Sequence, residues 1–401
     1  MPQSPLRVAI LGAGPTGLEA ALACAERGLP CTLYEAAPTV AGHVRRWGHV
    51  RVFTPWALNV SPRMAAALGA AGAEVPAGSE IPTGHELAER LYEPVAGLPA
   101  IAPRLRLGTR VLAVGREGLL KHEEIGTRAR AAHPFRILVA GPGGEERLEQ
   151  ADVVLDATGT YGNPNALGDG GIPAPGERAH AGRISHEIPD VAGAPEAWAG
   201  RTVLLTGTGH SAQTAARSLA QLAREAPGTR VIWAMREAAP SLAPSAGDPL
   251  PGRAALNRAA AELAAGASDA VEPRPGRVTE AVAGRDGRLA VTLRNGQPEE
   301  AVVDTVLALN GGVGDFTIYR QLQVHECYAT AGPMNLAAAL LGAAGGDCLA
   351  QQPHGPETLV NPEPGFFLIG AKSYGRNSQF LLRIGWSQVD DVFGLLDGGR
   401  A

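Results

Sequence analysis

The chain has 401 residues, of which 45% are hydrophobic and 19% are charged, and its formal net charge is −5. This length allows two or three domains, and this composition is typical of globular proteins with large hydrophobic cores. The modest negative charge gives no indication of a nucleic-acid or membrane partner, and no apolar run of about 18 residues predicts a transmembrane span.

The four cysteines are Cys24, Cys31, Cys327 and Cys348, and no two of them form a CxxC pair. The N-terminal residues also lack the basic and apolar regions of an export signal, because a core strand is predicted from Val8 onward. Together these features predict a protein of the reducing cytoplasm. They also argue against an enzyme that relies on a redox-active CxxC dithiol.

The most informative stretch is a strand–turn–helix–strand unit predicted near the N-terminus. An apolar strand over residues 8–11 leads directly into the glycine-rich turn GAGPTG of residues 12–17, and a helix over residues 18–27 follows. A second strand over residues 31–34 ends at Glu35. This order of elements is the fingerprint of a dinucleotide-binding βαβ unit, whereas a glycine-rich loop without a ligand is the alternative.

Each position of this fingerprint has a physical role in binding a dinucleotide. Gly12 allows the tight turn, Gly14 lets the backbone approach a pyrophosphate, and Gly17 lets the helix pack closely on the strand. The N–H groups and positive dipole end of the helix N-terminus suit the phosphates. Glu35 can accept hydrogen bonds from a ribose hydroxyl. The same site is predicted to include the neighbouring residues Pro15, Thr16 and Ala36.

A predicted loop after Glu35 would run over the dinucleotide and would bring His43 and Trp47 toward it. Asn59 then lies in the stretch LNVSP, ahead of a helix predicted over residues 63–71. His43 and Trp47 are therefore candidates for contacts with the ligand.

The middle of the chain is predicted to contain one more helix and several strands. Thr83 and Glu86 have the spacing of a capping box, which predicts a helix that ends just before Pro94. Strands are predicted over residues 105–114, 135–140, 146–148 and 152–159, the last of which ends at Thr158 and Gly159. The loop over residues 160–175 is rich in Gly, Pro and Asn and is interpreted as a domain boundary.

A second βαβ unit is predicted after this boundary. It has a strand from residue 202, a turn with Gly207 and Gly209, a helix to about residue 225 and a strand over residues 230–235. His210, Ser211 and Ala212 continue the turn as GxGxxA. Arg236 follows the second strand where an NAD site would carry an acid, and it suits the 2′-phosphate of NADPH. The alternatives are that Arg236 is a solvated strand end or that Glu237 faces the ribose instead.

The rest of the chain repeats the earlier pattern and then returns to the first unit. Strands are predicted between residues 276 and 309, followed by a helix over residues 336–344, a strand over 365–370 that ends at Gly370, and a closing helix over 378–396. The sequence therefore predicts an α/β fold of two Rossmann-like dinucleotide-binding domains, with the second inserted in the first. The first is expected over residues 1–165 and 315–401, and the second over residues 166–314.

Two such fingerprints, each followed by a bundle of strands and an Asp-led strand, resemble the two-dinucleotide-binding-domain flavoproteins. This group includes flavin-containing monooxygenases and disulfide-reductase-like enzymes. The resemblance covers nearly the whole chain and implies that the first domain binds FAD and the second binds NAD(P)H. The residues that it assigns to FAD are Gly12, Gly14, Gly17 and Glu35 for the ADP half, Val111 for the adenine, Thr158 and Gly159 as the ATG motif, and Gly370 on the last strand.

Further features resemble flavin-containing monooxygenases in particular. Ala371 stands where disulfide reductases commonly have an Asp, and Ser211 gives the second fingerprint the form GxGxS. Asn59 lies in a segment similar to their flavin-side loop, where an amide can donate to a peroxyflavin oxygen, although a turn-forming Asn is the alternative. Gly182 and His186 fit the spacing of their FxGxxxH motif, whose aromatic positions differ here. A structural histidine is the alternative for His186.

The resemblance implies an FAD-dependent, NADPH-driven oxidoreductase. In this interpretation O2 forms a C4a-peroxyflavin that oxygenates a soft nitrogen or sulfur atom of a small molecule. Two alternatives stay open: an NAD(P)H:acceptor flavoprotein reductase without oxygen insertion, and a non-catalytic FAD-binding protein. The expected partners are a small-molecule substrate and O2, no metal ligands are expected, and a homo-oligomer is compatible with the sequence.

Overall fold

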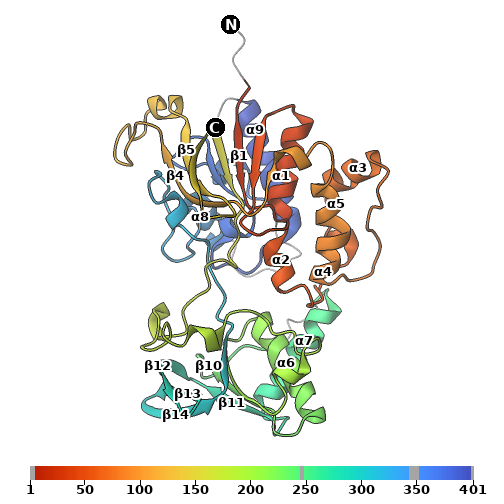
Figure 1. Cartoon of the computed structure of the whole chain (residues 1–401), viewed down its shortest axis with the longest axis vertical. Helices are drawn as coiled ribbons and strands as arrows, with labels where there is room; N and C mark the ends of the chain where they lie inside the picture. The colour runs from red at the N-terminus through yellow and green to blue at the C-terminus, as the bar shows by residue number, and fades with distance from the viewer. Residues whose placement is uncertain (1–4, 244–247, 343–351, 399–401) are drawn as a thin grey trace. The chain divides into compact units, whose positions relative to one another are not determined.

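A computed structural model describes residues 5–243, 248–342 and 352–398. The chain divides into two compact units, one made of Met1–Asn163 and Val313–Ala401 and the other of Pro164–Gly312. Each unit combines a parallel sheet, an antiparallel sheet and helices (Figure 1). The predicted α/β fold of two Rossmann-like units, the second inserted in the first, is confirmed.

The first unit is built on a five-stranded parallel sheet with the strand order β16-β7-β1-β2-β3. Its strands are β1 (Val8–Leu11), β2 (Cys31–Tyr34), β3 (Leu105–Arg106), β7 (Val153–Asp156) and β16 (Phe366–Leu368). All residues of β1 and β7 are buried, as expected for parallel strands that are covered on both faces. Because β1 is the central strand, the glycine turn that follows it leaves the sheet from the middle of its carboxyl edge.

The side chains of β1 alternate between two cores on the two faces of the sheet. Val8 and Ile10 belong to a core shared with the helices, whereas Ala9 and Leu11 belong to a core under the antiparallel sheet. The helices outside the segment after Thr83 are α1 (Pro15–Glu26), α2 (Gly42–Arg46), α3 (Pro62–Ala70), α8 (Met334–Gly342) and α9 (Leu382–Asp397). The antiparallel strands are β4 (Arg110–Arg116), β5 (Phe135–Ala140) and β6 (Glu146–Ala151).

The helix that starts after Thr83 passes through Pro94, so the prediction that it ends before this proline is wrong. The capping box is confirmed, because the Thr83 N–H donates to Glu86 Oε2 (2.7 Å) and the Glu86 N–H donates to Thr83 Oγ1 (3.2 Å). The helix continues as α4 (Gly84–Leu87), a π-helical turn (Ala88–Tyr92) and α5 (Glu93–Ala96). Proline lacks an N–H and clashes with the carbonyl four residues earlier in a regular α-helix, and the wider π turn relieves both conflicts.

The single strand predicted over residues 105–114 is two strands that belong to different sheets. Gly108 has a φ of +61° and turns the chain between β3, which pairs with β2, and β4, which pairs with β5. The Gly108 N–H donates to the Ala37 carbonyl and the Thr109 N–H donates to the Glu35 carbonyl, both at 2.8 Å. The break therefore attaches the antiparallel sheet to the segment that follows β2.

The helices near the C-terminus start at other residues than predicted. The closing helix α9 begins at Leu382 rather than residue 378, because the Gln379 N–H donates to Asn377 Oδ1 (2.9 Å) and holds this segment in a turn. Helix α8 begins at Met334 rather than residue 336, and its predicted end at residue 344 lies outside the described residues. Within the described ranges, no helix combines the length and the apolar character that crossing a membrane requires.

The second unit repeats the plan of the first. Its parallel sheet has the strand order β11-β10-β9-β15-β8, and a three-stranded antiparallel sheet accompanies it. Its elements are β8 (Ile184–Ser185), β9 (Thr202–Thr206), α6 (His210–Glu225), β10 (Arg230–Met235), α7 (Pro251–Ala264), β11 (Val271–Pro275), β12 (Val278–Arg285), β13 (Arg288–Asn295), β14 (Gln297–Val303) and β15 (Thr305–Ala308). Val203 and Leu205 belong to the core shared with the helices, and Leu204 belongs to the other core. Strand β9 is thus the central strand that leads into the second glycine turn, as β1 leads into the first.

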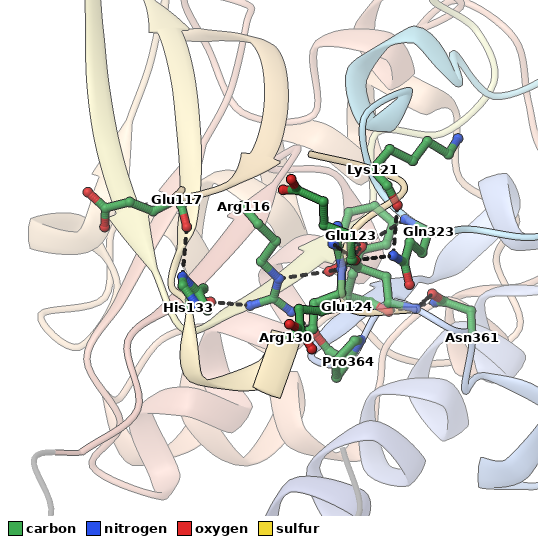
Figure 2. Close-up of polar contacts among 12 residues, drawn as sticks. Arg116, Glu117, Lys121, Glu123, Glu124, Arg130, His133, Gln323, Asn361 and Pro364 are labelled. Atoms are coloured by element: carbon green, nitrogen blue, oxygen red, sulfur yellow. Dashed lines mark hydrogen bonds and ion pairs between the residues drawn. The ribbon is translucent and has the colours of Figure 1, made fainter. Parts of the chain in front are cut away.

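A buried ion cluster holds the antiparallel sheet of the first unit to the segment before β16, and Figure 2 shows its surroundings. Glu363 is 1% exposed and accepts hydrogen bonds from Arg116 Nε at 2.7 Å and from Arg130 Nε at 2.9 Å. The Gln323 N–H also donates to Glu363 (2.7 Å), and the Gln323 side chain donates to the Lys121 carbonyl (2.7 Å). Burial lowers the pKa of Arg116, which the Glu363 carboxylate opposes. Two buried guanidinium groups therefore share one buried carboxylate.

Replacing Glu363 with Gln is expected to lower the free energy of unfolding by about 3–5 kcal/mol, because two buried guanidinium groups lose their carboxylate. Urea unfolding followed by circular dichroism measures this change. Glu146→Gln, at an exposed position of β6, is the control and should stay within about 0.5 kcal/mol of the parent. Equally small losses in both variants would show that the cluster does not hold the fold.

Candidate dinucleotide-binding sites

The first glycine turn brings strand β1 and helix α1 together backbone to backbone. Gly12 has a φ of +96°, and a Cβ atom there would lie 2.9 Å from the carbonyl oxygen of Ala157. A Cβ atom on Gly17 would lie 1.8 Å from the carbonyl oxygen of Gly12. By contrast, no atom lies within 4 Å of the position of a Cβ atom on Gly14. Gly14 thus borders open space at the N-terminus of α1, where the first-turn N–H groups can bind a phosphate.

The C-terminal segment of the chain reaches back to this turn. A Cβ atom on Gly370 would lie 2.9 Å from Thr16 Oγ1, and a Cβ atom on Gly385 in α9 would lie 2.8 Å from the same oxygen. Thr16 is accordingly only 7% exposed. Pro15 is the first residue of α1, where its missing N–H costs no hydrogen bond. The structure therefore brings the predicted residues Pro15, Thr16 and Gly370 together with the fingerprint glycines.

Glu35 lies beside the glycine turn because β2 pairs in parallel with β1. Its carboxylate accepts hydrogen bonds from the N–H groups of Ala13 and Ala37, each at 2.9 Å. Burial raises the pKa of Glu35, and the backbone N–H groups oppose this rise. Each carboxylate oxygen keeps a further lone pair with which it can accept a ribose hydroxyl. The neighbouring Ala36 is exposed on the same loop.

Thr158 and Gly159 are held by a buried ion pair of which the sequence gives no sign. Lys372 Nζ donates to Asp156 Oδ2 (2.6 Å), to Thr158 Oγ1 (3.0 Å) and to the Asp315 carbonyl (2.8 Å). Asp156 also accepts the hydroxyl of Thr158 (2.7 Å). All three ammonium N–H groups of Lys372 are used, so this lysine fixes the loop after β7. Gly159 itself has a φ of +70° and open space around the position of a Cβ atom.

His43 and Trp47 form an aromatic group with a third residue that the sequence does not single out. The Tyr161 ring lies near both side chains, with ring centroids 6.1 Å from His43 and 6.3 Å from Trp47. The Ala41 N–H donates to the Ala13 carbonyl (2.9 Å), which ties this segment to the glycine turn. Within the described ranges, the buried Nε1 of Trp47 has no hydrogen-bond partner. It is therefore an available hydrogen-bond donor.

The two remaining candidates of the first unit, Asn59 and Val111, have different surroundings. The Asn59 amide donates to the carbonyls of Thr54 and Pro55 at 2.8 Å each, and its oxygen accepts the Thr54 hydroxyl (3.0 Å). Both amide N–H groups are used inside the turn, which favours the turn-forming interpretation of Asn59. Val111 is half-buried and pairs with Val139 of β5, just before a register shift between Val111 and Ala113. Its role toward an adenine stays a prediction.

The second glycine turn resembles the first: one glycine has no room for a Cβ atom, and another borders open space. Gly207 has a φ of +101°, and a Cβ atom there would lie 2.3 Å from the Leu309 carbonyl oxygen. No atom lies within 4 Å of the position of a Cβ atom on Gly209. His210 and Ser211 are the first two residues of α6 and border this open position. The N-terminus of α6 can therefore bind a phosphate as the N-terminus of α1 can.

A charged group near the start of α7 lies close to His210. Burial lowers the pKa of His210, and the charge of Arg253 lowers it further, whereas Asp248 and a hydrogen bond with Asn257 oppose this change. Arg253 Nη2 lies 2.8 Å from Asp248 Oδ1. The charged residues near this turn are therefore Arg253 and Asp248, which form an ion pair with each other.

Arg236 directly follows β10 at the carboxyl edge of the parallel sheet, and it is exposed. Within the part of the chain that the structure describes, Arg236 takes part in no ion pair. The nearby Arg277 is instead paired with Glu299 at 2.7 Å. The Glu237 carbonyl accepts the Gly276 N–H (3.0 Å), and the Glu237 side chain is exposed as well. Both Arg236 and Glu237 are therefore accessible to a ribose bound at this edge.

The histidine that resembles part of the monooxygenase motif is used inside the second sheet. His186 follows β8, and its Nδ1 lies 3.1 Å from the Ala308 carbonyl oxygen of the neighbouring strand β15. This contact favours the structural interpretation of His186. Metal sites were not expected, and among the described residues no group of three or more His, Cys, Asp or Glu side chains is placed to hold a metal ion.

Comparisons with known proteins agree with this geometry. Residues 10–70 match the family model of the NAD(P)-binding Rossmann-like domain, while no curated protein matches the chain in sequence. The solved structure of the bacillithiol disulfide reductase Bdr (YpdA) from Bacillus cereus is similar with a TM-score of 0.71. Its sequence is 17% identical, and the alignment covers 99% of this chain and 100% of that one.

Two solved structures of amine-oxidising enzymes are also similar. The cadaverine monooxygenase DfoA from Erwinia amylovora, bound to FAD, has a TM-score of 0.65 and 12% identity over 99% of this chain and 95% of that one. The ornithine N-hydroxylase KtzI from Kutzneria sp. 744 has a TM-score of 0.61 and 14% identity over 99% of this chain and 100% of that one. The chain has a fold of two Rossmann-like domains that these proteins share. At these identities the similarity shows the fold and neither a cofactor nor a reaction.

The fold of the first unit should be sensitive to a methyl group on Gly17. The Gly17→Ala variant is expected to lose about 3 kcal/mol or more of stability, because its Cβ atom would overlap the Gly12 carbonyl oxygen. Gly394→Ala is the matched control: Gly394 is exposed in α9 with nothing within 4 Å, so alanine should add up to about 1 kcal/mol. Urea unfolding of both variants tests this, and the same sign of change in both would contradict it.

Proposed function

We propose that this chain is an FAD-dependent, NADPH-driven oxidoreductase that oxygenates a soft nitrogen or sulfur atom of a small molecule with O2. The observation that carries the proposal is the pair of open glycine positions, Gly14 and Gly209, each at the N-terminus of a helix after a central strand. Each unit also has a different charged residue at the end of its second strand, Glu35 in one and Arg236 in the other. Two such sites suit one dinucleotide with two ribose hydroxyls and another with a 2′-phosphate.

The residues of the first unit fit FAD. Its pyrophosphate would lie against Gly14 and the N-terminus of α1, and Glu35 would accept the ribose hydroxyls. Val111 would lie on the adenine side, and the loop of Thr158 would lie on the flavin side, where the unpartnered Nε1 of Trp47 offers a further hydrogen bond. When bound, FAD would supply the redox chemistry, accepting a hydride and passing electrons to oxygen. The protein residues bind and orient it.

The residues of the second unit fit NADPH. The pyrophosphate would lie against Gly209 and the N-terminus of α6, with His210 and Ser211 beside it. Arg236 would bind the 2′-phosphate, because a guanidinium forms paired, charge-assisted hydrogen bonds with phosphate oxygens. Glu237 is the competing residue, and a ribose that faces Glu237 would favour NADH.

Oxygen insertion is the finer part of the proposal, and a second candidate function competes with it. The full sequence has no CxxC pair, which a dithiol reductase would use, and Asn59 lies in a segment that resembles the flavin-side loop of monooxygenases. The competing function is an acceptor reductase, and the similar structure of Bdr is that of a protein named a disulfide reductase. For the oxygenating enzyme, the proposed partners are a small-molecule substrate and O2.

The Gly14→Val variant should fail to retain flavin while it still folds. Gly14 has φ −83° and ψ −172°, which valine adopts without strain, and no neighbour lies within 4 Å. The valine methyl groups would instead occupy the phosphate position. Bound flavin per chain, measured after purification and again after addition of FAD, should fall from about one in the parent to near zero. Unchanged circular dichroism confirms that the variant is folded.

Gly209→Val is the matched control for this experiment. Gly209 has a similar extended backbone, with φ −68° and ψ 171°, and the same open surroundings. This variant should keep its flavin, whereas reduction of the flavin by NADPH should become much slower. A fully loaded Gly14→Val protein would show that the FAD assignment is wrong. Loss of flavin from Gly209→Val would show that the two sites are assigned in the wrong order.

The proposed enzyme should prefer NADPH over NADH, and Arg236→Ala should remove this preference. A charge-assisted contact of this kind is worth about 1.5–3 kcal/mol, so NADPH affinity should fall about 10- to 150-fold while NADH affinity changes little. Stopped-flow reduction of the flavin at several nucleotide concentrations gives both affinities. Arg230→Ala, at the exposed start of β10, is the control and should leave both unchanged. A parent enzyme that prefers NADH would instead support Glu237 as the ribose contact.

The fate of O2 separates the candidate functions. The reduced enzyme is mixed with O2 and with amines or sulfides while absorbance, H2O2 and product are followed. A transient near-ultraviolet absorbance and substrate-dependent formation of an oxygenated product are expected. Reoxidation without either would support the acceptor reductase, and a flavin that neither NADPH nor NADH reduces would support a non-catalytic FAD-binding protein.

The role of Asn59 is tested in the same assay. Asn59→Leu removes the amide, whose two N–H groups are bound by the carbonyls of Thr54 and Pro55 in the structure. If this amide turns to support oxygenation, hydride transfer should survive in the variant while NADPH consumption is diverted into H2O2. Thr54→Val is the control, because it removes one hydrogen bond of the turn but leaves the Asn59 amide in place. Equal coupling in Asn59→Leu and in the parent would leave Asn59 as a turn residue.

A further inference from the structure

Two cysteines that are seven positions apart come together at the amino end of the first sheet. Cys24 lies in α1 and is fully buried, while Cys31 is the first residue of β2 and is half-buried. Cys24 belongs to the core between the sheet and the helices, Cys31 packs against that core, and both thiols are free. The chain between them turns back, with the Leu29 N–H donating to the Cys24 carbonyl (2.9 Å). The pair therefore arises from the packing of a helix on a strand, and no CxxC spacing marks it.

An arginine completes this group of side chains. Arg104 Nη1 lies 3.3 Å from Cys31 Sγ and donates to the Leu29 carbonyl at 2.7 Å. The interaction with Cys24, followed by the Arg104 contact, lowers the pKa of Cys31 to about 7 against the effect of burial. The interaction with Cys31 and burial raise the pKa of Cys24, while the charges of Arg104 and Arg27 oppose the rise. Cys31 is thus the half-buried thiol that ionises more readily, and Cys24 is its fully buried, protonated neighbour.

We propose that Cys31 and Cys24 form a peroxide-oxidised dithiol, in which Cys31 reacts first and Cys24 closes the disulfide. The Cys31 thiolate attacks one oxygen of hydrogen peroxide, an S–O bond forms as the O–O bond breaks, and the leaving hydroxide takes up a proton to become water. The Cys24 sulfur then attacks the Cys31 sulfenic acid. The S–S bond forms, and the hydroxyl group leaves as a second water with the Cys24 proton. Two thiols are oxidised by two electrons, and one peroxide is reduced to two waters.

This dithiol is a separate site from the glycine turn. Cys31 pairs with Val8 at the start of β1, whereas Tyr34 pairs with Leu11 at the end that leads into Gly12. Three residues of strand separate the two ends by about 10 Å. The pair therefore does not stand where a flavin-coupled dithiol would exchange electrons with the cofactor bound at the turn. Hydrogen peroxide is the oxidant, whether or not the proposed oxygenation takes place.

The sequence between the two cysteines makes the product easy to detect. Trypsin cleaves after Arg27, so Cys24 falls in the peptide of residues 8–27 and Cys31 in the peptide of residues 28–45. The full-length protein, with Cys327 and Cys348 replaced by Ser, is treated with hydrogen peroxide, blocked with an alkylating agent and digested without reductant. The two peptides should appear as one disulfide-linked species that has lost two hydrogen atoms and that a reductant separates.

Single substitutions test the order of the two steps. Cys24→Ala keeps a small buried side chain but removes the second thiol, so a sulfenic acid that dimedone labels should accumulate on Cys31. Cys31→Ser should leave Cys24 unlabelled, because Cys24 is buried. Arg104→Gln should raise the pH at which Cys31 is half-alkylated and slow peroxide oxidation at pH 7 about three- to tenfold, as expected when a thiolate loses a neighbouring cation.

Arg106→Gln is the matched control for Arg104, because Arg106 lies in β3 and its side chain donates to the carbonyls of Pro103 and Leu105. It should change neither the alkylation profile nor the oxidation rate. The proposal is overturned if the parent yields no linked peptide at peroxide concentrations that oxidise a free thiol. It is also overturned if the linked peptide forms equally fast in Arg104→Gln and the parent, or if dimedone labels Cys24 rather than Cys31. The parent measurement decides the matter even where a variant fails to fold.

Discussion

The contact between Gly17 and the Gly12 carbonyl is the constraint on which the first unit depends. A Cβ atom on Gly17 would lie 1.8 Å from that oxygen, so helix α1 can start directly at the end of β1 only because residue 17 has no side chain. This close approach places the first turn of the helix beside the open position at Gly14. In the second unit Gly207 corresponds to Gly12, and a Cβ atom there would lie 2.3 Å from the Leu309 carbonyl oxygen, while Ala212 stands where the first unit has Gly17. The open position at Gly14 is therefore a consequence of strand–helix packing in the first unit.

The first unit is completed by a segment more than 200 positions away in the chain, and buried charges set where that segment lies. Lys372 reaches Asp156 across 216 positions, and Glu363 holds Arg116 across 247. Buried ion pairs add little net stability compared with apolar packing, but a misplaced segment would leave each charge buried without its partner. Such pairs thus act against alternative placements of the returning strand. The result is that Gly370 arrives against Thr16, beside the glycine turn.

Those parts of the fold that depend on neighbouring residues could be predicted from the sequence, and those that depend on distant residues could not. The glycine spacing and the strand and helix of each fingerprint are local, as is the capping box at Thr83, and the structure contains all of them. The break at Gly108 and the π turn before Pro94 need knowledge of which sheet or helix the chain packs against. The Lys372 ion pair forms only when the C-terminal segment packs beside β7, and Cys24 meets Cys31 only when α1 packs on β2. Nothing in the spacing of these residues along the chain indicates their partners.

The two glycine turns share one backbone design, so the charge at the end of the second strand is what distinguishes them. Glu35 is half-buried and its pKa is raised by burial, so a second negative charge beside it would interact more strongly than in water. A 2′-phosphate is thus disfavoured at the first site, whereas free ribose hydroxyls can donate to the carboxylate. Arg236 is exposed and, among the described residues, forms no ion pair, so a phosphate could bind it without breaking an existing one. Either turn can hold a pyrophosphate, and one side chain in each unit, Glu35 or Arg236, would decide which dinucleotide binds there.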